Sequence, residues 1–264
     1  MSRCHIHCHL NYKIISPTTF VFQIQAQPCA SQQILAEHFE ISPQIQWHEY
    51  QCLAHQNRHI RFQSQPCSSL DVYYTATIER DLRFRSLEHL NEVPISQLPD
   101  VVLPYLLPSL YCQSDELVEM AQRSFAWMPQ GYVRVKAIEQ WIYNQIMYQS
   151  GSSNHLSTAR DILIQRAGVC RDFAHLGIAL CRALGIPARI VVGYVKIEKF
   201  IPDFHAIFEA YLDGGWVRFD ATRLAPVEHL VQIAVGRDAS DVAFATFYGQ
   251  VELLNISPVI HYDD

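Results

Sequence analysis

Residues 168–173 read Gly-Val-Cys-Arg-Asp-Phe, and they begin a segment with one apolar side. The apolar residues that follow recur at helical spacing: Phe173, Leu176, Leu180 and Leu184. Residues 185–187 then place a glycine before a proline, the usual order where a helix ends. The sequence therefore predicts a well-bounded amphipathic helix with a cysteine, Cys170, in its first turn.

The position of Cys170 favours a reactive sulfur. A first-turn side chain lies beside unsatisfied N–H groups and the positive end of the helix dipole, which stabilise a thiolate. Such a site, with a cationic neighbour, can lower a thiol pKa from ~8.5 into the range of roughly 3.5 to 7.5. The backbone N–H of Cys170 is also a candidate oxyanion donor. We expect Cys170 to be a nucleophile, although a buried cysteine at a helix start, taken alone, is more often inert packing.

A β-hairpin is predicted for residues 205–222. Residues 213–214 are Asp-Gly, which favours a two-residue type I′ turn. This turn sets a register in which Glu209 faces Arg218, a favourable cross-strand pair. The residues of the other face are uniformly apolar: Ala206, Phe208, Ala210, Leu212, Val217, Phe219 and Ala221. We therefore expect one core face and one face that carries chemistry.

The same register makes His205 and Asp220 diagonal neighbours, roughly 7 to 8 Å apart at Cα. A carboxylate can reach an imidazole over that separation. Asp220 would hold the ring tautomer while the other ring nitrogen exchanges a proton with Cys170. His175 is a poorer base, because five residues along a helix turn it about 140° away from Cys170. The predicted site is therefore Cys170, His205 and Asp220.

Two upstream residues are candidates for a second oxyanion donor. Trp141 and Tyr148 both carry a polar hydrogen on an aromatic ring. The stripe of an amphipathic helix explains Trp141 without such a role. The sequence leaves the donor open between them.

The N-terminal residues 4–9 contain two cysteines and three histidines, a composition that suggests metal binding. In an extended strand His5, His7 and His9 would point to one face, and Cys4 and Cys8 to the other. Ligands divided in this way do not converge on a tetrahedral ion. We expect no metal here, and no cofactor elsewhere.

The two ends of the chain differ in their patterns. Residues 1–100 favour strands, because residues 18–25 and 69–78 are rich in β-branched and aromatic side chains. Beyond the proline-spaced residues 93–108, the periodicity becomes helical. We expect an antiparallel, β-sandwich-like domain in residues 1–100, followed by an α+β catalytic domain in residues 101–264.

Short-range signals within the second domain support this division. Thr158 and Asp161 have the spacing of a capping box, which predicts a short helix. Gly168 is expected at the C-terminal end of that helix.

Composition limits the partners. The 264 residues are 49% hydrophobic and 17% charged, with a net charge of -6 and no run of Lys or Arg, which disfavours nucleic acid. No stretch approaches the ~18 apolar residues of a membrane span, and the first residues lack the apolar region of a secretory signal. Eight scattered cysteines in a large chain do not suggest a disulfide framework. We expect a cytoplasmic protein without a membrane or nucleic-acid partner.

Several motifs occur together between residues 155 and 225. They lie at residues 166–175, 185–189, 193–194, 203–206, 209–211, 216 and 219–222. The combination resembles the transglutaminase-like superfamily, in particular bacterial proteins described as transglutaminase-like enzymes or candidate cysteine proteases. Residues 1–100 resemble their N-terminal domain more loosely, and residues 236–242 resemble a loop that they carry after the site.

This resemblance implies a papain-like α+β core with helices packed on an antiparallel sheet. In that core Cys170 is the nucleophile, His205 the base and Asp220 the third member. The calcium sites and extra C-terminal β-domains of animal transglutaminases have no counterpart in these motifs, so a calcium-switched crosslinking enzyme is not expected.

The expected reaction begins when Cys170 attacks a peptide or side-chain amide of a protein or peptide substrate, and it proceeds through a thioester. Water would make the protein a protease or amidase, and an amine would make it a transglutaminase. We favour hydrolysis. The alternative is not an enzyme but a binding protein, a non-catalytic module that holds a peptide in a papain-like groove.

Overall fold

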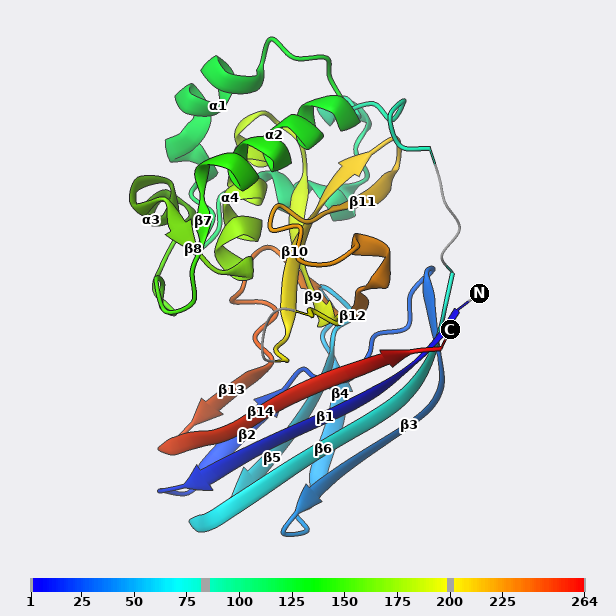
Figure 1. The fold of residues 1–264 in the computed structure, drawn as a ribbon, viewed down its shortest axis with the longest axis vertical. Coiled ribbons are helices and arrows are strands. Elements are labelled where there is room, and N and C mark those ends of the chain that lie inside the picture. Colours follow the sequence, from blue (N-terminus) through cyan, green and yellow to red (C-terminus); the bar gives the residue numbers. More distant parts are fainter. Residues whose placement is uncertain (1, 82–85, 199–201, 264) are drawn as a thin grey trace.

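The computed structural model describes residues 2–81, 86–198 and 202–263. Two parts are visible in Figure 1, a β-rich part below and a sheet covered by helices above. Both parts contain antiparallel sheets, and helices are confined to the upper one. This is the α+β class expected from the sequence, with helices packed on an antiparallel sheet and a β-rich part beside them.

The β-rich part consists of two four-stranded sheets. The first has the order β14 (Val251–Tyr262), β1 (Ser2–Ile14), β6 (Cys67–Arg80) and β3 (Gln32–Ser42). The second has the order β13 (Ala245–Tyr248), β2 (Thr18–Phe22), β5 (Arg58–Ser64) and β4 (Trp47–Gln51). Strands β2 and β6 confirm the two segments that β-propensity had indicated. Stacked rings of Phe20, Phe22 and Phe62 fill the core beneath the second sheet.

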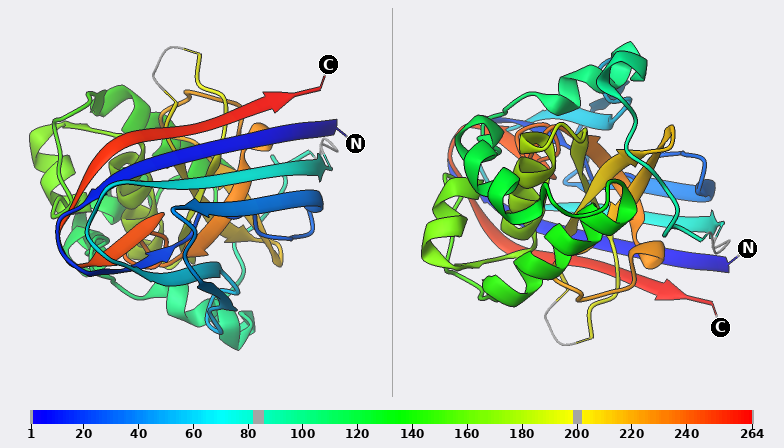
Figure 2. Two further views of the ribbon diagram at one scale, coloured as in Figure 1. Left: turned by 90° about the horizontal axis from the view of Figure 1, so that it is seen from below. Right: turned by 90° about the horizontal axis from the view of Figure 1, so that it is seen from above.

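The C-terminal residues return to this part of the molecule. Strands β14 and β13 pair with β1 and β2, although a division at residue 100 groups residues 245–262 with the catalytic domain. The two chain ends consequently lie side by side (Figures 1 and 2). Each sheet of the β-rich part therefore gains one edge strand from the far end of the sequence.

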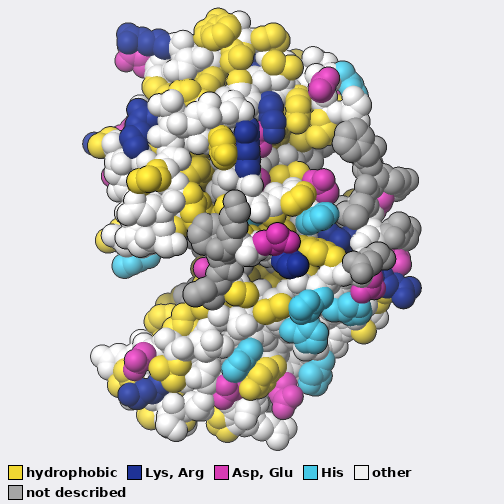
Figure 3. Space-filling view, viewed as in Figure 1, with side chains coloured by type: hydrophobic (Ala, Val, Ile, Leu, Met, Phe, Trp, Pro, Cys, Tyr) yellow, Lys and Arg dark blue, Asp and Glu magenta, His cyan; other side chains and the backbone are white. Residues whose placement is uncertain are grey.

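Strand β1 divides its side chains as alternation predicts. Cys4 and Cys8 are buried in the core, whereas His5, His7 and His9 lie on the other side of the strand. Figure 3 shows histidines gathered on the outside of the β-rich part. The cysteines and histidines of residues 4–9 thus point away from one another.

The upper part is built on a sheet with the order β11 (Gly215–Phe219), β10 (His205–Leu212), β9 (Ala188–Tyr194) and β12 (Val231–Gly236). Its helices are α1 (Val118–Phe125), α2 (Tyr132–Gln145), α3 (Ala159–Gln165) and α4 (Cys170–Ala183). Short 3-10 helices precede α1 or lie between β11 and β12: η1 (Ile95–Gln97), η2 (Asp100–Leu106), η3 (Ser114–Leu117) and η4 (Val227–His229). Helix α4 is the central one, because it contacts β10 and each of the other three helices.

Helix α4 packs tightly on β10. A Cβ atom at Gly177 would lie 2.7 Å from the ring of Phe208, so the absence of a side chain allows this approach. Helix α4 ends as expected, with Gly185 in a left-handed conformation at φ 78.

The hairpin register is confirmed. Leu212 pairs with Gly215, and Glu209 pairs with Arg218. Both faces of β10 are nevertheless buried, because Tyr211 packs against Leu98 and Val102 of the segment that leads through η2. The face of β10 that was predicted to carry the site is therefore buried along most of its length.

The capping box of α3 is also confirmed, since Thr158 and Asp161 exchange hydrogen bonds. The expectation that Gly168 ends this helix is wrong. Arg166 takes the left-handed position at φ 60, and Gly168 lies in the two-residue strand β8 (Ala167–Gly168). A Cβ atom at Gly168 would meet the side chain of Asp172 at 2.8 Å, so this glycine accommodates the start of α4 instead.

Two buried amides join the parts at β12, the edge strand of the upper sheet. The Asn57 side chain donates to Val235 O at 2.8 Å and accepts from Val235 N at 3.0 Å. The Gln32 side chain makes the same pair of bonds with Gln232, both at 2.8 Å. Side chains of the β-rich part thereby satisfy backbone groups that an edge strand leaves open.

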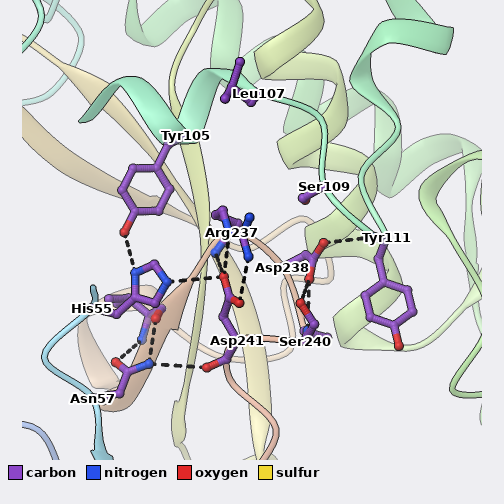
Figure 4. Close-up of polar contacts among 12 residues, drawn as sticks. His55, Asn57, Tyr105, Leu107, Ser109, Tyr111, Arg237, Asp238, Ser240 and Asp241 are labelled. Carbon is purple, nitrogen blue, oxygen red and sulfur yellow. Dashed lines mark hydrogen bonds and ion pairs between the residues drawn. The ribbon is translucent and has the colours of Figure 1, made fainter. Parts of the chain in front are cut away.

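The loop that follows β12 adds polar contacts between the parts (Figure 4). Asp241 Oδ2 accepts from the Arg237 backbone N–H at 2.9 Å and lies 3.3 Å from His55 Nε2. His55 in turn contacts the Tyr105 hydroxyl at 2.9 Å. Through Asp241 and His55, the loop at residues 236–242 therefore links η2 to the β-rich part.

In the described ranges, none of the helices has both the length and the apolar character that crossing a membrane requires.

Candidate active site

Cys170 is the first residue of α4, and its side chain is partly exposed. A two-stranded parallel pairing brings the chain to this point: β7 (Met147–Tyr148) lies beside β8. The N–H of Gln149 donates to Gly168 O at 2.9 Å, which extends the pairing. The start of α4 is therefore held by backbone hydrogen bonds before the helix begins.

Asp172 anchors the first turn from inside. Its fully buried carboxylate accepts from the backbone N–H of Val169 at 2.9 Å and from the Ser153 hydroxyl. The Arg171 guanidinium donates to the same carboxylate at 2.9 Å and to Asn154 O at 2.6 Å. Because a negative charge here also faces the positive end of the helix dipole, Asp172 fixes the orientation of the turn that carries Cys170.

His205 and Asp220 form a buried ion pair. His205 Nε2 lies 2.9 Å from Asp220 Oδ2, and the two side chains are only 2% and 4% exposed. The diagonal placement derived from the hairpin register is thus observed. The Cys170 side chain lies close to the same imidazole, because it acts on the pKa of His205 in the same direction as Asp220 does. The structure therefore brings together all three residues that the sequence singled out.

The surroundings favour the charged form of His205. Burial alone lowers the pKa of this imidazole, but hydrogen bonds to Asp220 and Cys170 outweigh burial and raise it to about 10. For Asp220, burial raises the pKa, and the contact with His205 together with two bonds from Thr222 brings it below its ordinary value. The pair is consequently an imidazolium and a carboxylate at neutral pH.

Thr222 is a supporting residue that the sequence reasoning did not assign. Its backbone N–H and its hydroxyl donate to Asp220 Oδ1 at 2.9 and 2.7 Å. These bonds leave Oδ2 directed at His205. The signal was present, because a carboxylate commonly accepts from the N–H two residues ahead in an Asx turn.

The two candidates for a second oxyanion donor, Tyr148 and Trp141, lie in different surroundings. Tyr148 pairs with Gly168 just before Cys170, and burial together with the nearby Cys170 raises the pKa of its phenol. Trp141, in α2, packs edge-on against Phe125, and the Arg166 guanidinium lies 5.4 Å from its ring centre. Tyr148 therefore lies near Cys170, whereas the contacts of Trp141 lie among the helices.

His175 is fully buried on another side of α4. Its Nε2 accepts from the backbone N–H of Ala239 at 3.1 Å, and its ring stacks on Tyr111. Burial lowers the pKa of this imidazole to about 4. His175 is thus a neutral packing residue under the loop at residues 236–242, as expected from its helical position.

Among the described residues, no three His, Cys, Asp or Glu side chains are arranged to hold a metal ion. The polar side chains near Cys170 form hydrogen bonds within the protein, as His205 does with Asp220 and Asp172 with the backbone of Val169. What the arrangement offers chemically is a thiol at a helix N-terminus, an imidazolium and a buried carboxylate.

The chain is similar to known families and to a solved structure. Residues 118–221 match the family described as the transglutaminase-like superfamily, and residues 2–101 match the bacterial transglutaminase N-terminal domain. A solved structure from Cytophaga hutchinsonii, described as a candidate cysteine protease, is 42% identical with a TM-score of 0.93. The alignment covers 100% of this chain and 91% of that chain.

Curated relatives are found in mycobacteria. An uncharacterized protein of Mycobacterium leprae is 29% identical over 184 residues, which are 67% of this chain and 64% of that protein. An uncharacterized protein of Mycobacterium bovis is 44% identical over 115 residues, covering 38% and 37% of the two chains. The matched region therefore spans less than two thirds of the length of either mycobacterial protein.

Proposed function

The chain belongs to the transglutaminase-like superfamily, and we propose that it is a cysteine-nucleophile acyl-transfer enzyme that acts on peptide or side-chain amide bonds. One observation carries the proposal. The imidazole of His205 has the Asp220 carboxylate on one ring nitrogen and the Cys170 side chain close by. A thiolate and an imidazolium at a helix N-terminus are the groups that amide cleavage requires.

The reaction proceeds in two stages. The Cys170 thiolate forms a bond to the amide carbon, and the carbonyl electron pair moves onto oxygen. When the carbonyl re-forms, the carbon–nitrogen bond breaks and the amine leaves with the proton of the His205 imidazolium. A thioester remains on Cys170. His205, now neutral, removes a proton from the next nucleophile, which attacks the thioester and releases the enzyme.

We propose water as that second nucleophile, which makes the protein a protease or amidase acting on protein or peptide substrates. The 42% identity to a structure described as a candidate cysteine protease supports this choice over transamidation. The two outcomes separate in one assay. Peptide and glutamine-amide substrates are incubated with and without a primary amine, and incorporation of the amine into the acyl product would identify a transglutaminase instead.

Replacing the nucleophile tests the proposal directly. Cys170→Ala should lower the turnover of any amide substrate by at least about 10³-fold, because no other group can form the thioester. Cys52→Ala is the matched control, since Cys52 is also partly exposed but lies in the β-rich part. Full activity of Cys170→Ala would eliminate the mechanism.

Thiol labelling distinguishes an enzyme from a peptide-binding module. In an enzyme, iodoacetamide should modify Cys170 faster than the other seven cysteines below neutral pH, and His205→Ala should abolish the preference. Slow, uniform labelling of all exposed thiols would favour the binding module.

We also propose a cytoplasmic location. The support is that all eight cysteines are free thiols, which is typical of proteins kept in a reducing compartment. Cell fractionation checks this, and recovery of the protein outside the cytoplasm would contradict it.

A further inference from the structure

Asp220 lies just beyond the end of a β-strand. The pairing of β10 with β11 ends at Phe208 and Phe219, so it stops one residue before the carboxylate. Inside the turn that follows, the N–H of Arg223 donates to Asp220 O at 3.2 Å, in addition to the two bonds from Thr222. These local bonds fix the shape of the turn but not its position against the rest of the upper part.

The side chain of Arg223 connects this turn to α2. Its guanidinium donates to Gln140 Oε1 and lies 3.9 Å from the carboxylate of Glu139. It also lies over the ring of Tyr143, with 4.3 Å between the guanidinium carbon and the ring centre. A hydrogen bond, an ion pair and a cation–π contact therefore join one side chain to one side of a helix.

Glu139 makes this contact more than a surface ion pair. Its carboxylate is only 4% exposed, whereas the Arg223 side chain is 36% exposed. Burial raises the pKa of Glu139, and the nearby Lys136 and Arg223 act against burial. Salt and water screen a partly buried pair less than an exposed one. The guanidinium is thus held at a defined place on α2.

The backbone of Arg223 is in the left-handed region, with φ 55. Residues with a Cβ atom rarely adopt this conformation, and glycine and asparagine adopt it most readily. An arginine at such a position has a conformational cost that other interactions must offset. The unfavourable backbone and the three contacts on α2 together point to a role for this side chain that glycine could not fill.

We propose that Arg223 is a positioning residue, which holds the turn of Asp220 against α2 so that Oδ2 of Asp220 stays on the imidazole of His205. The inference rests on the proposed acyl-transfer function and adds a residue that acts on it through Asp220. Because α2 also packs on α4, which begins with Cys170, one helix supports both the acid and the nucleophile. In this role Arg223 gives and takes no proton.

Arg223→Gly tests the proposal, because it removes the three contacts and also relieves the left-handed backbone. The fold should therefore persist, which circular dichroism and Tm verify. We expect kcat on an amide substrate to fall by about 10- to 100-fold with KM changed by less than about threefold, since the orientation of the base is lost and substrate binding is not. Gln56→Gly is the matched control: Gln56 has φ 57 but is exposed in the β-rich part, and this variant should keep full activity.

The alkaline limit of activity separates positioning from a simple effect of charge. The titratable groups that act on His205 are Asp220, Cys170 and Asp203. Arg223→Gly leaves all three in place. Loss of a nearby cation would by itself favour the imidazolium and move the limit to higher pH, whereas a loosened Asp220 stabilises the imidazolium less. We therefore expect the limit to move down by about 0.5 to 1 pH unit.

Arg223→Lys provides the rescue. Its ammonium group keeps a cation that can face Glu139 and lie over Tyr143, so we expect kcat within about fivefold of wild type and an alkaline limit close to the wild-type one. A folded Arg223→Gly with wild-type kcat, or with a limit that stays in place or rises, would overturn the inference. No recovery in Arg223→Lys would overturn it as well, because the contacts with α2 would then not explain the loss.

NMR titration keeps the inference distinguishable from the proposed function. The ring signals of His205, assigned by their absence in His205→Gln, report its pKa without any turnover. We expect this pKa to be lower in Arg223→Gly than in wild type by about 0.5 to 1 unit. If the wild-type protein cleaved no amide, the proposed function would fall while such a shift still supported the role of Arg223. Equal pKa values in the two proteins would overturn that role whether or not the protein is active.

Discussion

At the scale of single residues, the contact that organises the site is the 2.9 Å bond from His205 Nε2 to Asp220 Oδ2. Each end of the pair has its own support. Thr222 donates to the other oxygen of Asp220, and the Cys170 side chain lies close to the imidazole of His205. The imidazole can therefore neither rotate nor lose its charge easily.

This pairing makes the alkaline side of the activity profile depend on Asp220. The pKa of His205 is raised to about 10 in the folded protein, so its imidazolium persists far above the ordinary value of 6.5. The proton needed by the leaving amine is available below that pKa and is lost as the pH rises through it. Activity should therefore decline on the alkaline side near pH 10.

Asp220→Asn removes the negative charge and should move this decline down by about 1 to 3 pH units, together with a large loss of kcat. The measurement is kcat/KM between pH 5 and pH 11, with circular dichroism to verify folding. Asp115→Asn, at an exposed position in η3, should leave the profile unchanged. An alkaline limit that stays in place in Asp220→Asn would show that another group sets it.

The same shift links stability to pH. Because the folded pKa of His205 is the higher one, its pairing stabilises the fold fully below the unfolded value of 6.5. That contribution disappears as the pH rises through about 10. The buried pair should thus stabilise the fold over the same pH interval in which we expect activity.

At the scale of elements, the fit between α4 and β10 sets the position of the site. The helix delivers Cys170 and the strand delivers His205. They can approach one another because Gly177 faces the ring of Phe208, which is itself stacked on Phe219.

Gly177→Ala tests this fit. In an exposed helix the change would stabilise by about 1 kcal/mol through helix propensity. Here the new methyl group would overlap a buried ring at 2.7 Å, so we expect a loss of about 1 to 3 kcal/mol in the free energy of unfolding. Urea denaturation followed by fluorescence measures it.

Two variants sharpen the result. Gly215→Ala should change the free energy of unfolding by less than about 0.5 kcal/mol, because its nearest neighbour would lie 3.9 Å away. Adding Phe208→Leu to Gly177→Ala should recover part of the loss by giving the methyl group room. A stabilised Gly177→Ala would refute the proposed packing constraint.

At the scale of the whole molecule, the β-rich part contacts the upper sheet at its edge strand, β12. Asn57 and Gln32 reach across to β12 and pair with the backbone at Val235 and Gln232. Their amides act in place of a neighbouring strand. This arrangement connects the stability of the two parts.

Asn57→Ala should therefore be costly. It would leave both backbone groups of Val235 without their side-chain partner in a buried environment, at about 2 to 4 kcal/mol in the free energy of unfolding. Calorimetry provides the measurement, with the exposed Asn255→Ala as the control. If the two variants proved equally stable, the amide would not be what joins the parts.

Local signals explain the parts of the fold and site that could be predicted. The Asp-Gly turn at residues 213–214 determines the hairpin register, and alternation then places His205 near Asp220. The apolar stripe and the Gly-Ile-Pro end determine α4. Each of these signals acts over a few residues, so tertiary packing did not need to be known.

Contacts between segments far apart along the chain could not be predicted, because no local pattern in the sequence indicates them. Nothing near Val251 indicates that β14 pairs with β1, because an edge strand with few buried side chains lacks a clear apolar pattern. Burial on both faces of β10 was also missed, since residues 93–106 fold over a face that alternation marks as polar.

The amino-acid sequence by itself determined the helix that presents Cys170 and the hairpin that pairs His205 with Asp220, because backbone geometry propagates from a turn or a cap through the next few residues. Tertiary structure alone decided that Tyr148 lies near Cys170, that Asn57 and Gln32 satisfy β12, and that the last strands join the first. These contacts join residues far apart along the chain, and their energy depends on how complete layers pack rather than on any local preference.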